Sequence, residues 1–393
     1  MSELLESRWL DTKNALLEGL QGTKKSVMSA TLENTRKYLS ETAGAGATSA
    51  GNVATLNRVI LPVIRRVMPT VIANELVGVQ PMTGPVGQIH TLRVRYAEAM
   101  NDTSAGNTDT TAGEEALSPF KIAEAYSGNA ATAKADSTAA LEGAAGRKMS
   151  IQILKQTVEA KSRKLSARWT FESAQDAQSQ HGIDVEAEIM AALAQEITAE
   201  IDQEILLSLS TLAATEFTYN QATVSGTATF VGDEHAALAV LINRTANKIA
   251  SRTRRGAGNW AVVSPFTLTL LQSATTSAFA RTTEGTFEAP TNTKMVGTLN
   301  SAMRVYVNTY ATDNADVLIG YKGTSESDAA AFYCPYIPLM SSGVVLDPAT
   351  FEPTVSFMTR YGYVELTNTA SSLGNAADYL GKVAVTATNV SFS

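Results

Sequence analysis

A run of apolar residues spaced four apart constrains the fold of this 393-residue chain more than any other feature. Its members are Val185, Ile189, Leu193, Ile197, Ile201, Ile205 and Leu209. Four residues advance about 400° around an α-helix, so the apolar stripe drifts by about 40° per step. We therefore predict one helix over residues 184–209, about 39 Å long, laid across a sheet. We expect the core of this helix to comprise Ile189, Leu193, Ile197, Ile201 and Ile205.

The remaining face of this predicted helix is acidic, and Glu196 and Glu200 stand one turn apart on it. Paired carboxylates are used for metal binding and for acid–base chemistry. A charged helix face turned to solvent explains the same residues, and it is the interpretation that we adopt.

The sequence carries none of the usual signatures of catalysis. The histidines His90, His181 and His235 are isolated in sequence and distant from the single cysteine, Cys334, so no zinc spacing occurs. A phosphate loop and a nucleophile elbow are also absent. We predict that the protein is not an enzyme and that it uses no metal or cofactor. We expect Cys334 to be a buried small hydrophobe.

The charge balance disfavours several classes of partner. The net charge is −7, whereas proteins that bind nucleic acid through phosphates usually present a basic surface. Arg65, Arg66 and the basic turn at 252–255 could contact phosphate, but subunit salt bridges or a helix C-terminus explain them equally well. We predict no sequence-specific nucleic-acid binding. No apolar run is long enough for a membrane span, and the N-terminus lacks signal-peptide features.

The N-terminal region has the pattern of amphipathic helices followed by a tether. Apolar residues recur at spacings of three, four and seven from Leu5 to Leu39, with breaks near Gly19 and Gly22. Residues 42–52 are almost all small, which is typical of a flexible linker. Two interpretations stay open. Either the segment docks on a partner or is removed, or it packs on its own domain.

Residues 97–148 contain few large apolar side chains, which leaves this segment no core of its own. Alternating strand-like sequence precedes it at 89–97 and follows it from Met149. We predict a long two-stranded arm whose partners lie elsewhere, and disorder of 97–148 is the alternative. Beyond Thr211, helical and strand-like pieces are mixed, which is typical of α+β architecture.

Three blocks of the sequence are similar to the major capsid proteins of T-even-type tailed bacteriophages. The first is 63–96, which contains VQPMTGP, and the second is 156–189, which contains VEAKSRKL. The third covers 304–339 and 351–366 and contains GYKG and DAAAFYCPYIPL. The blocks occur in the family's order and span most of the chain, so together they are very specific.

The resemblance implies an α+β protein with the Hong Kong 97-type capsid fold, acting as a shell tile and not as an enzyme. The implied parts are an N-terminal segment at 1–41, an N-arm at 42–85, an extended loop at 86–165, a peripheral domain at 166–220 and 341–393, and an axial domain at 221–340. Only about fifty residues separate Tyr96 from Met149. The large insertion of the best-known family members is therefore expected to be absent.

The resemblance also implies partners and a location. Copies of the chain would form hexamers within an icosahedral head around double-stranded DNA, with a separate vertex protein, a portal, a scaffold and a prohead protease. The chain would be made in the bacterial cytoplasm and end in the virion. A cellular nanocompartment shell, marked by cargo enzyme, and a specialised vertex subunit, marked by low copy number, are the alternatives.

Relatives lose an N-terminal segment, which is cut after a glutamate that follows a hydrophobic residue and one spacer. Leu39, Glu41 and Thr42 fit that pattern, so residues 1–41 are expected to be a scaffold-binding propeptide.

Overall fold

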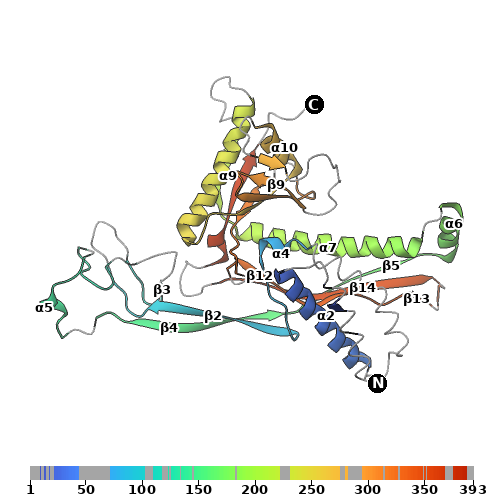
Figure 1. Ribbon diagram of the computed structural model, residues 1–393, viewed down its shortest axis with the longest axis horizontal. Coiled ribbons are helices and arrows are strands. Elements are labelled where there is room, and N and C mark those ends of the chain that lie inside the picture. The colour runs from blue at the N-terminus through green and yellow to red at the C-terminus, as the bar shows by residue number, and fades with distance from the viewer. Residues whose placement is uncertain are drawn as a thin grey trace. The chain divides into compact units, whose positions relative to one another are not determined.

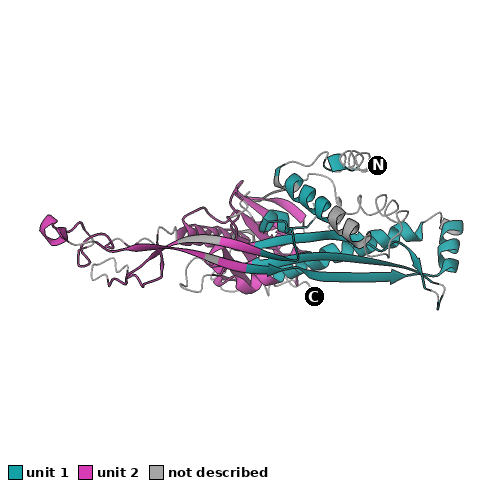
Figure 2. Ribbon diagram, turned by 90° about the horizontal axis from the view of Figure 1, so that it is seen from below, with its two compact units in different colours: residues 1–87, 157–207, 332–364 teal, residues 88–156, 208–331, 365–393 magenta. Residues whose placement is uncertain are grey.

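The computed structural model describes residues 9, 13–14, 17, 22–43, 71–101, 109–116, 123, 125–132, 134–143, 146–181, 184–221, 231–274, 279–281, 294–312, 315–325, 328–347, 349–350, 352–367 and 375–386. Helices and strands are mixed along the chain, which confirms the predicted α+β class (Figure 1). The chain divides into two compact units, described separately below (Figure 2). Unit 1 comprises residues 1–87, 157–207 and 332–364, and unit 2 comprises 88–156, 208–331 and 365–393.

Unit 1 combines a five-stranded sheet with the long helix α7 (Val185–Leu212). The strands, in sheet order, are β1 (Gly78–Val79), β12 (Ala331–Ser341), β14 (Pro353–Glu365) and β13 (Val345–Leu346), with β5 (Lys161–Arg168) paired to β14. The helix α7 agrees with the range predicted from the four-residue spacing. Of the predicted core residues, Ile189 is half-buried, and the side chains at 8% exposure or less are Leu193, Ile197, Ile201 and Ile205.

The burial of β14 and β12 shows which faces of these two strands are covered. The alternate residues Val355, Phe357 and Tyr361 of β14 are buried, because successive strand side chains point to opposite faces. Strand β12 is buried at every residue except Tyr336, so both of its faces are covered. A strand covered on both faces loses the alternation that marks half-buried strands.

The N-terminal helix α2 (Gly22–Ala43) packs on unit 1 itself. Its side chains Val27, Met28 and Leu32 are buried. The side-chain amide of Asn34 donates hydrogen bonds to the carbonyls of Met82, at 2.6 Å, and Tyr336, at 3.2 Å. In the structure this helix is therefore packed on its own unit, and removal of the N-terminal segment stays a prediction.

Two short helices complete the described part of unit 1. The helix α4 spans Ala73–Leu76, and residues 44–70 before it lie outside the described range. The helix α6 (Phe171–His181) precedes α7.

The predicted two-stranded arm is present in a three-stranded sheet of order β3, β2, β4. These strands are β2 (Val86–Tyr96), β3 (Glu115–Ala116) and β4 (Met149–Glu159). The short helix α5 (Thr138–Leu141) lies between β3 and β4 in the chain.

The expectation that residues 97–148 have no core of their own is wrong. A small buried cluster joins Tyr96, Met100, Ala116, Ala125 and Tyr126. The rings of Tyr96 and Tyr126 lie 4.4 Å apart between centroids. The guanidinium of Arg147 closes the cluster by donating to the backbone carbonyls of Ala125 and Tyr126. Two aromatic rings thus supply apolar area that small residues lack.

The rest of unit 2 is built on a seven-stranded sheet. Its strands, in sheet order, are β6 (Thr215–Asn220), β15 (Leu380–Thr386), β11 (Val317–Gly320), β7 (Trp260–Val263), β10 (Met303–Val307), β9 (Lys294–Leu299) and β8 (Phe279–Arg281). The helices α9 (Val231–Thr253) and α10 (Pro265–Ser273) share its core, and η2 (Ala376–Tyr379) leads into β15. At Gly320 any Cβ would meet the Trp260 ring at 2.1 Å, so this position requires glycine.

Two strands of the seven-stranded sheet come from ranges that the resemblance assigns to the peripheral domain. The strands β6 and β15 fall within the predicted peripheral ranges 166–220 and 341–393, yet they pair with each other in the seven-stranded sheet. The physical reason lies in the alternation of β15, because Val383 and Val385 point into the core of that sheet. Conversely, β12 lies almost wholly in the predicted axial range 221–340 and belongs to the five-stranded sheet, and all of the subdomain boundaries stay predictions.

Candidate functional site

The described residues contain no group of three or more histidine, cysteine or acidic side chains that could hold a metal ion. His90 lies exposed in β2, His181 ends α6, and His235 is buried in α9. The Nδ1 atom of His235 lies 2.6 Å from the Ser273 hydroxyl oxygen, and burial lowers the pKa of its imidazole. In the part of the chain that the structure describes, no helix is long and apolar enough to cross a membrane.

Cys334 is buried in β12, as predicted. Burial raises the pKa of its thiol to about 11. The thiol therefore stays protonated at neutral pH, and a protonated thiol is a poor nucleophile and a poor metal ligand.

The basic turn after α9 forms ion pairs within unit 2. Arg252 lies 2.8 Å from the Glu216 carboxylate and donates to the backbone carbonyl of Leu380. Arg255 lies 2.7 Å from the Asp328 carboxylate. These contacts favour a structural role over phosphate binding. Arg65 and Arg66 lie outside the described residues.

Arg163 on β5 forms ion pairs with the acidic face of α7. Its guanidinium contacts the carboxylates of Glu200, at 2.7 Å, and Glu204, at 2.6 Å. It also donates to the Tyr361 hydroxyl on β14, which in turn donates to Glu204. Burial opposes ionisation of Glu204, but the hydrogen bonds from Tyr361 and Arg163 outweigh it and lower the pKa of that carboxyl. Glu196 is exposed, so the predicted solvent face holds for Glu196 but Glu200 is paired.

Exposed apolar side chains are the clearest candidates for a functional surface. On β4, Ile151 and Ile153 are 70% and 67% exposed, and Met149 is also exposed. Because strand residues two apart share a face, these three side chains form one stripe, which we call the arm face. Contiguous exposed apolar surface of this kind marks interaction sites. The alternation of β4 was visible in the sequence. The exposure of the arm face could not be predicted, because it depends on which segments pack nearby.

A second exposed apolar patch lies at β13, the edge strand of the five-stranded sheet. We call it the edge patch, and its residues are Val344, Val345 and Leu346. Near the following loop, a hollow of about 380 Å³ is lined by Thr170, Phe171, Glu172, Thr350 and Glu352. The edge patch could have been noticed in the sequence as three consecutive apolar residues between Gly343 and Asp347.

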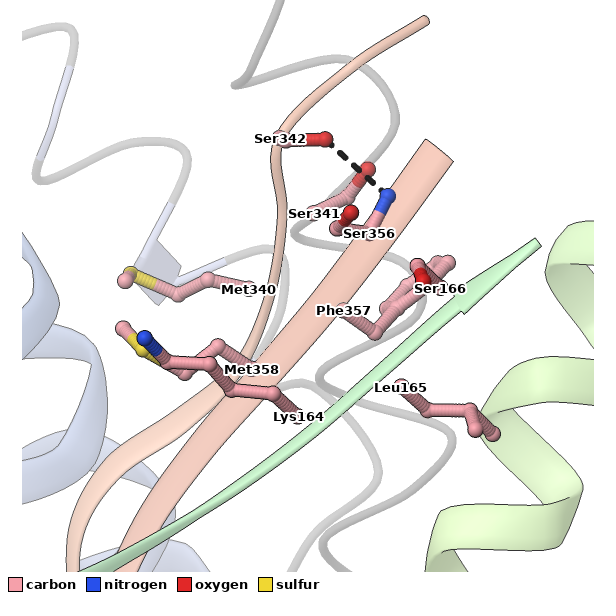
Figure 3. Close-up of a pocket in the computed structure, with 9 residues that line it drawn as sticks. All are labelled: Lys164, Leu165, Ser166, Met340, Ser341, Ser342, Ser356, Phe357 and Met358. Carbon is pink, nitrogen blue, oxygen red and sulfur yellow. Dashed lines mark hydrogen bonds between the residues drawn. The ribbon is translucent and has the colours of Figure 1, made fainter. Parts of the chain in front are cut away.

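A groove of about 430 Å³ crosses β5, β12 and β14 of unit 1 (Figure 3). Met340, Met358 and Lys164 lie side by side in it, whereas Leu165 points toward α7. The Ser342 hydroxyl accepts a hydrogen bond from the backbone N–H of Ser356 at 3.0 Å. Flexible methionine side chains suit an adaptable contact surface, and the lining offers no nucleophile paired with a base.

The expected cleavage residues Leu39, Glu41 and Thr42 lie in the last turn of α2. Their side chains are outside the described range. The helix extends through Thr42 and Ala43, the first two residues of the flexible linker predicted at 42–52.

Comparison with known proteins adds an independent line of observation. The family described as Major capsid protein Gp23 matches residues 53–385. The major capsid protein of Vibrio phage KVP40 is 29% identical, over 84% of this chain and 80% of that protein. The major capsid protein of Enterobacteria phage T6 is 30% identical, over 83% of this chain and 81% of that protein.

Solved structures of phage particles also resemble this chain. One, from Microbacterium phage Oxtober96, has a TM-score of 0.46 at 8% identity, covering 80% of this chain and 90% of that one. Another, titled the capsid of Myoviridae Phage XM1, has a TM-score of 0.43 at 10% identity, covering 80% of this chain and 92% of that one.

Proposed function

Because the chain belongs to the Gp23 major capsid protein family, we propose that it is a shell tile whose copies join into hexamers of an icosahedral phage head around double-stranded DNA. The single observation that carries this proposal is the extent of the family match, residues 53–385. That range includes the arm, α7 and both large sheets. The protein is a structural component of the capsid and has no catalytic role.

The arm face supports the proposal at the level of residues. A side chain such as Ile151, 70% exposed in one copy, gains free energy when a neighbour covers it, at about 25 cal/mol per Å² of apolar area. Each contact is modest, but closed symmetry repeats it at every subunit. We propose that residues 86–165 act as the extended loop and lie on a neighbouring subunit.

The subdomain roles follow from the two units. We propose the five-stranded sheet with α7 as the peripheral domain and the seven-stranded sheet, including β6 and β15, as the axial domain. The partners proposed beyond further copies of this chain are a vertex protein, a portal, a scaffold and a prohead protease. Assembly is proposed to take place in the bacterial cytoplasm and to end in the virion.

Hydrogen exchange tests the arm contact. In assembled shells, backbone amides of residues 97–153 should exchange more slowly than in free subunits, because a neighbour covers them. The backbone N–H of Met100 donates to the carbonyl of Thr110 at 2.9 Å and Met100 is buried, so this amide should be protected in both states and serves as an internal control. Equal exchange of the whole arm in shells and free subunits would contradict the proposal.

We also propose that residues 1–41 are a propeptide cut between Glu41 and Thr42. Proteases need an extended and exposed chain, so the last turn of α2 must unwind before the cut. Intact-mass spectrometry of mature virions tests this. A subunit that begins at Thr42 is the expected result, and a full 41.6 kDa chain in infectious heads would exclude it.

A further inference from the structure

One buried carboxylate in unit 1 has no charge partner in the part of the chain that the structure describes. Asp202 lies on α7 and its side chain is 1% exposed. Its Oδ1 atom accepts a hydrogen bond of 2.9 Å from the backbone N–H of Ile72. Its Oδ2 atom is buried and has no hydrogen-bond partner among the described residues. An acid in this position is unusual, because buried charges are normally paired.

The segment that Asp202 holds is the root of the N-arm, residues 71–77. Ile72 precedes α4, and its own backbone N–H donates to the carboxyl group of Asp202, 130 positions further along the chain. Val71, Ile72, Leu76 and Val77 are all buried. The hydrogen bond from Ile72 to Asp202 thus attaches this root to α7 beside its buried apolar side chains.

Among the residues that the structure describes, the charges around Asp202 include no cation bonded to it. The guanidinium of Arg163 on β5 is bonded to Glu200 and Glu204, which lie two residues to either side of Asp202 on α7. It is also bonded to the Tyr361 hydroxyl on β14, and Lys161 acts on Glu204. The groups on β12 are Tyr333 and Cys334, both of which are neutral at physiological pH because burial raises their pKa values.

From this geometry we propose that Asp202 is a proton-operated latch, which holds the N-arm root on α7 while it is neutral and releases the root when it ionises. An ionised carboxylate with one amide donor and no cation is costly in a dry interior. Separation of residues 71–77 from α7 admits water to both oxygens and relieves that cost. The latch is a property of the folded subunit and does not depend on the shell.

The direction of the pH response follows from thermodynamic linkage. Burial raises the pKa of Asp202 from 3.8 to about 7, against the opposing effect of the Ile72 hydrogen bond. The folded subunit therefore binds this proton more tightly than the unfolded chain does. The stabilisation is complete below about pH 4 and is lost as the pH rises through about 7.

Hydrogen exchange on the full chain at about pH 6 and about pH 8.5 tests the latch, after correction for the intrinsic pH dependence of exchange. Amides of residues 71–77 should lose protection by about tenfold at the higher pH, because stability changes about tenfold per pH unit between the unfolded and folded pKa values of Asp202, and pH 6 lies about one unit below the folded value of about 7. Asp202→Asn keeps the acceptor oxygen without a charge, so its protection should be equal at the two pH values. Glu196→Gln removes an exposed acid from the same helix and should behave like the unmodified protein.

Two results would overturn the proposal. One is equal protection of residues 71–77 in the unmodified protein at both pH values. The other is a loss of protection in Asp202→Asn that matches the unmodified protein. If Asp202→Asn does not fold, the unmodified protein and Glu196→Gln still decide the question.

Discussion

Replacement of Ile197 by aspartate should abolish both the folded subunit and the particle. Ile197 lies in the middle of α7 and is 1% exposed. The new carboxylate would be buried without a cation, which costs on the order of 3–5 kcal/mol in addition to the lost apolar contacts. A domain of ordinary stability has only about 5–15 kcal/mol in total. The measurement is the yield of soluble subunit together with its thermal unfolding midpoint.

The matched control for this substitution is Leu207→Asp. Leu207 lies on the same helix but is 70% exposed, so the same charge enters solvent there. We expect this variant to give soluble subunit with an unfolding midpoint close to that of the unmodified chain. An Ile197→Asp subunit that melts within a few degrees of Leu207→Asp would show that the stripe on α7 is not a core.

The double substitution Ile151→Asp and Ile153→Asp should block assembly while leaving the subunit folded. Both side chains are at least two-thirds exposed in one copy, so the folded subunit loses little. In a shell, each carboxylate would be buried against a neighbour at about 1–3 kcal/mol, repeated at every subunit. We expect particle yield to fall to about one-tenth or less, because interface penalties multiply across a closed shell.

Sedimentation and electron microscopy of purified material give the particle yield, and circular dichroism reports whether the subunit is folded. The control is Val240→Asp, which places the same charge at an apolar side chain that is 64% exposed on α9 and outside the arm. If the double variant gave as many particles as the Val240→Asp control, the arm face would not be covered in the shell.

The helices and strands that could be predicted from the sequence were those in which apolar residues recur with the helical or the strand period. The four-residue spacing located α7, because every fourth side chain of a helix returns to nearly the same face. Two-residue alternation located β2 and β4 for the corresponding reason. The family resemblance, carried by residue identities, indicated the capsid function. Helix and strand periodicity cannot do this, because unrelated functions share folds.

Contacts between distant segments could not be read from these patterns. Arg163 meets Glu204 and Tyr361 only because β5 and β14 lie beside α7, and these residues are 41 and 198 positions away in the chain. Asp202 follows Ile201 in sequence and looks like one more acid of the helix face. Its burial is decided by the N-arm root that packs over it.

Local sequence patterns were enough to predict the apolar period of α7, the alternation of the arm strands and the lack of catalytic motifs, since each depends on residues close together in the chain. The packing of α2 on its own unit, the pairing of β15 with β6 and the exposure of Ile151 depend on contacts between distant segments and became known only from the structure. The physical reason is that an amphipathic segment specifies only that one face must be buried. The surface that covers this face, or leaves it open for a neighbouring subunit, comes from residues far away in the sequence.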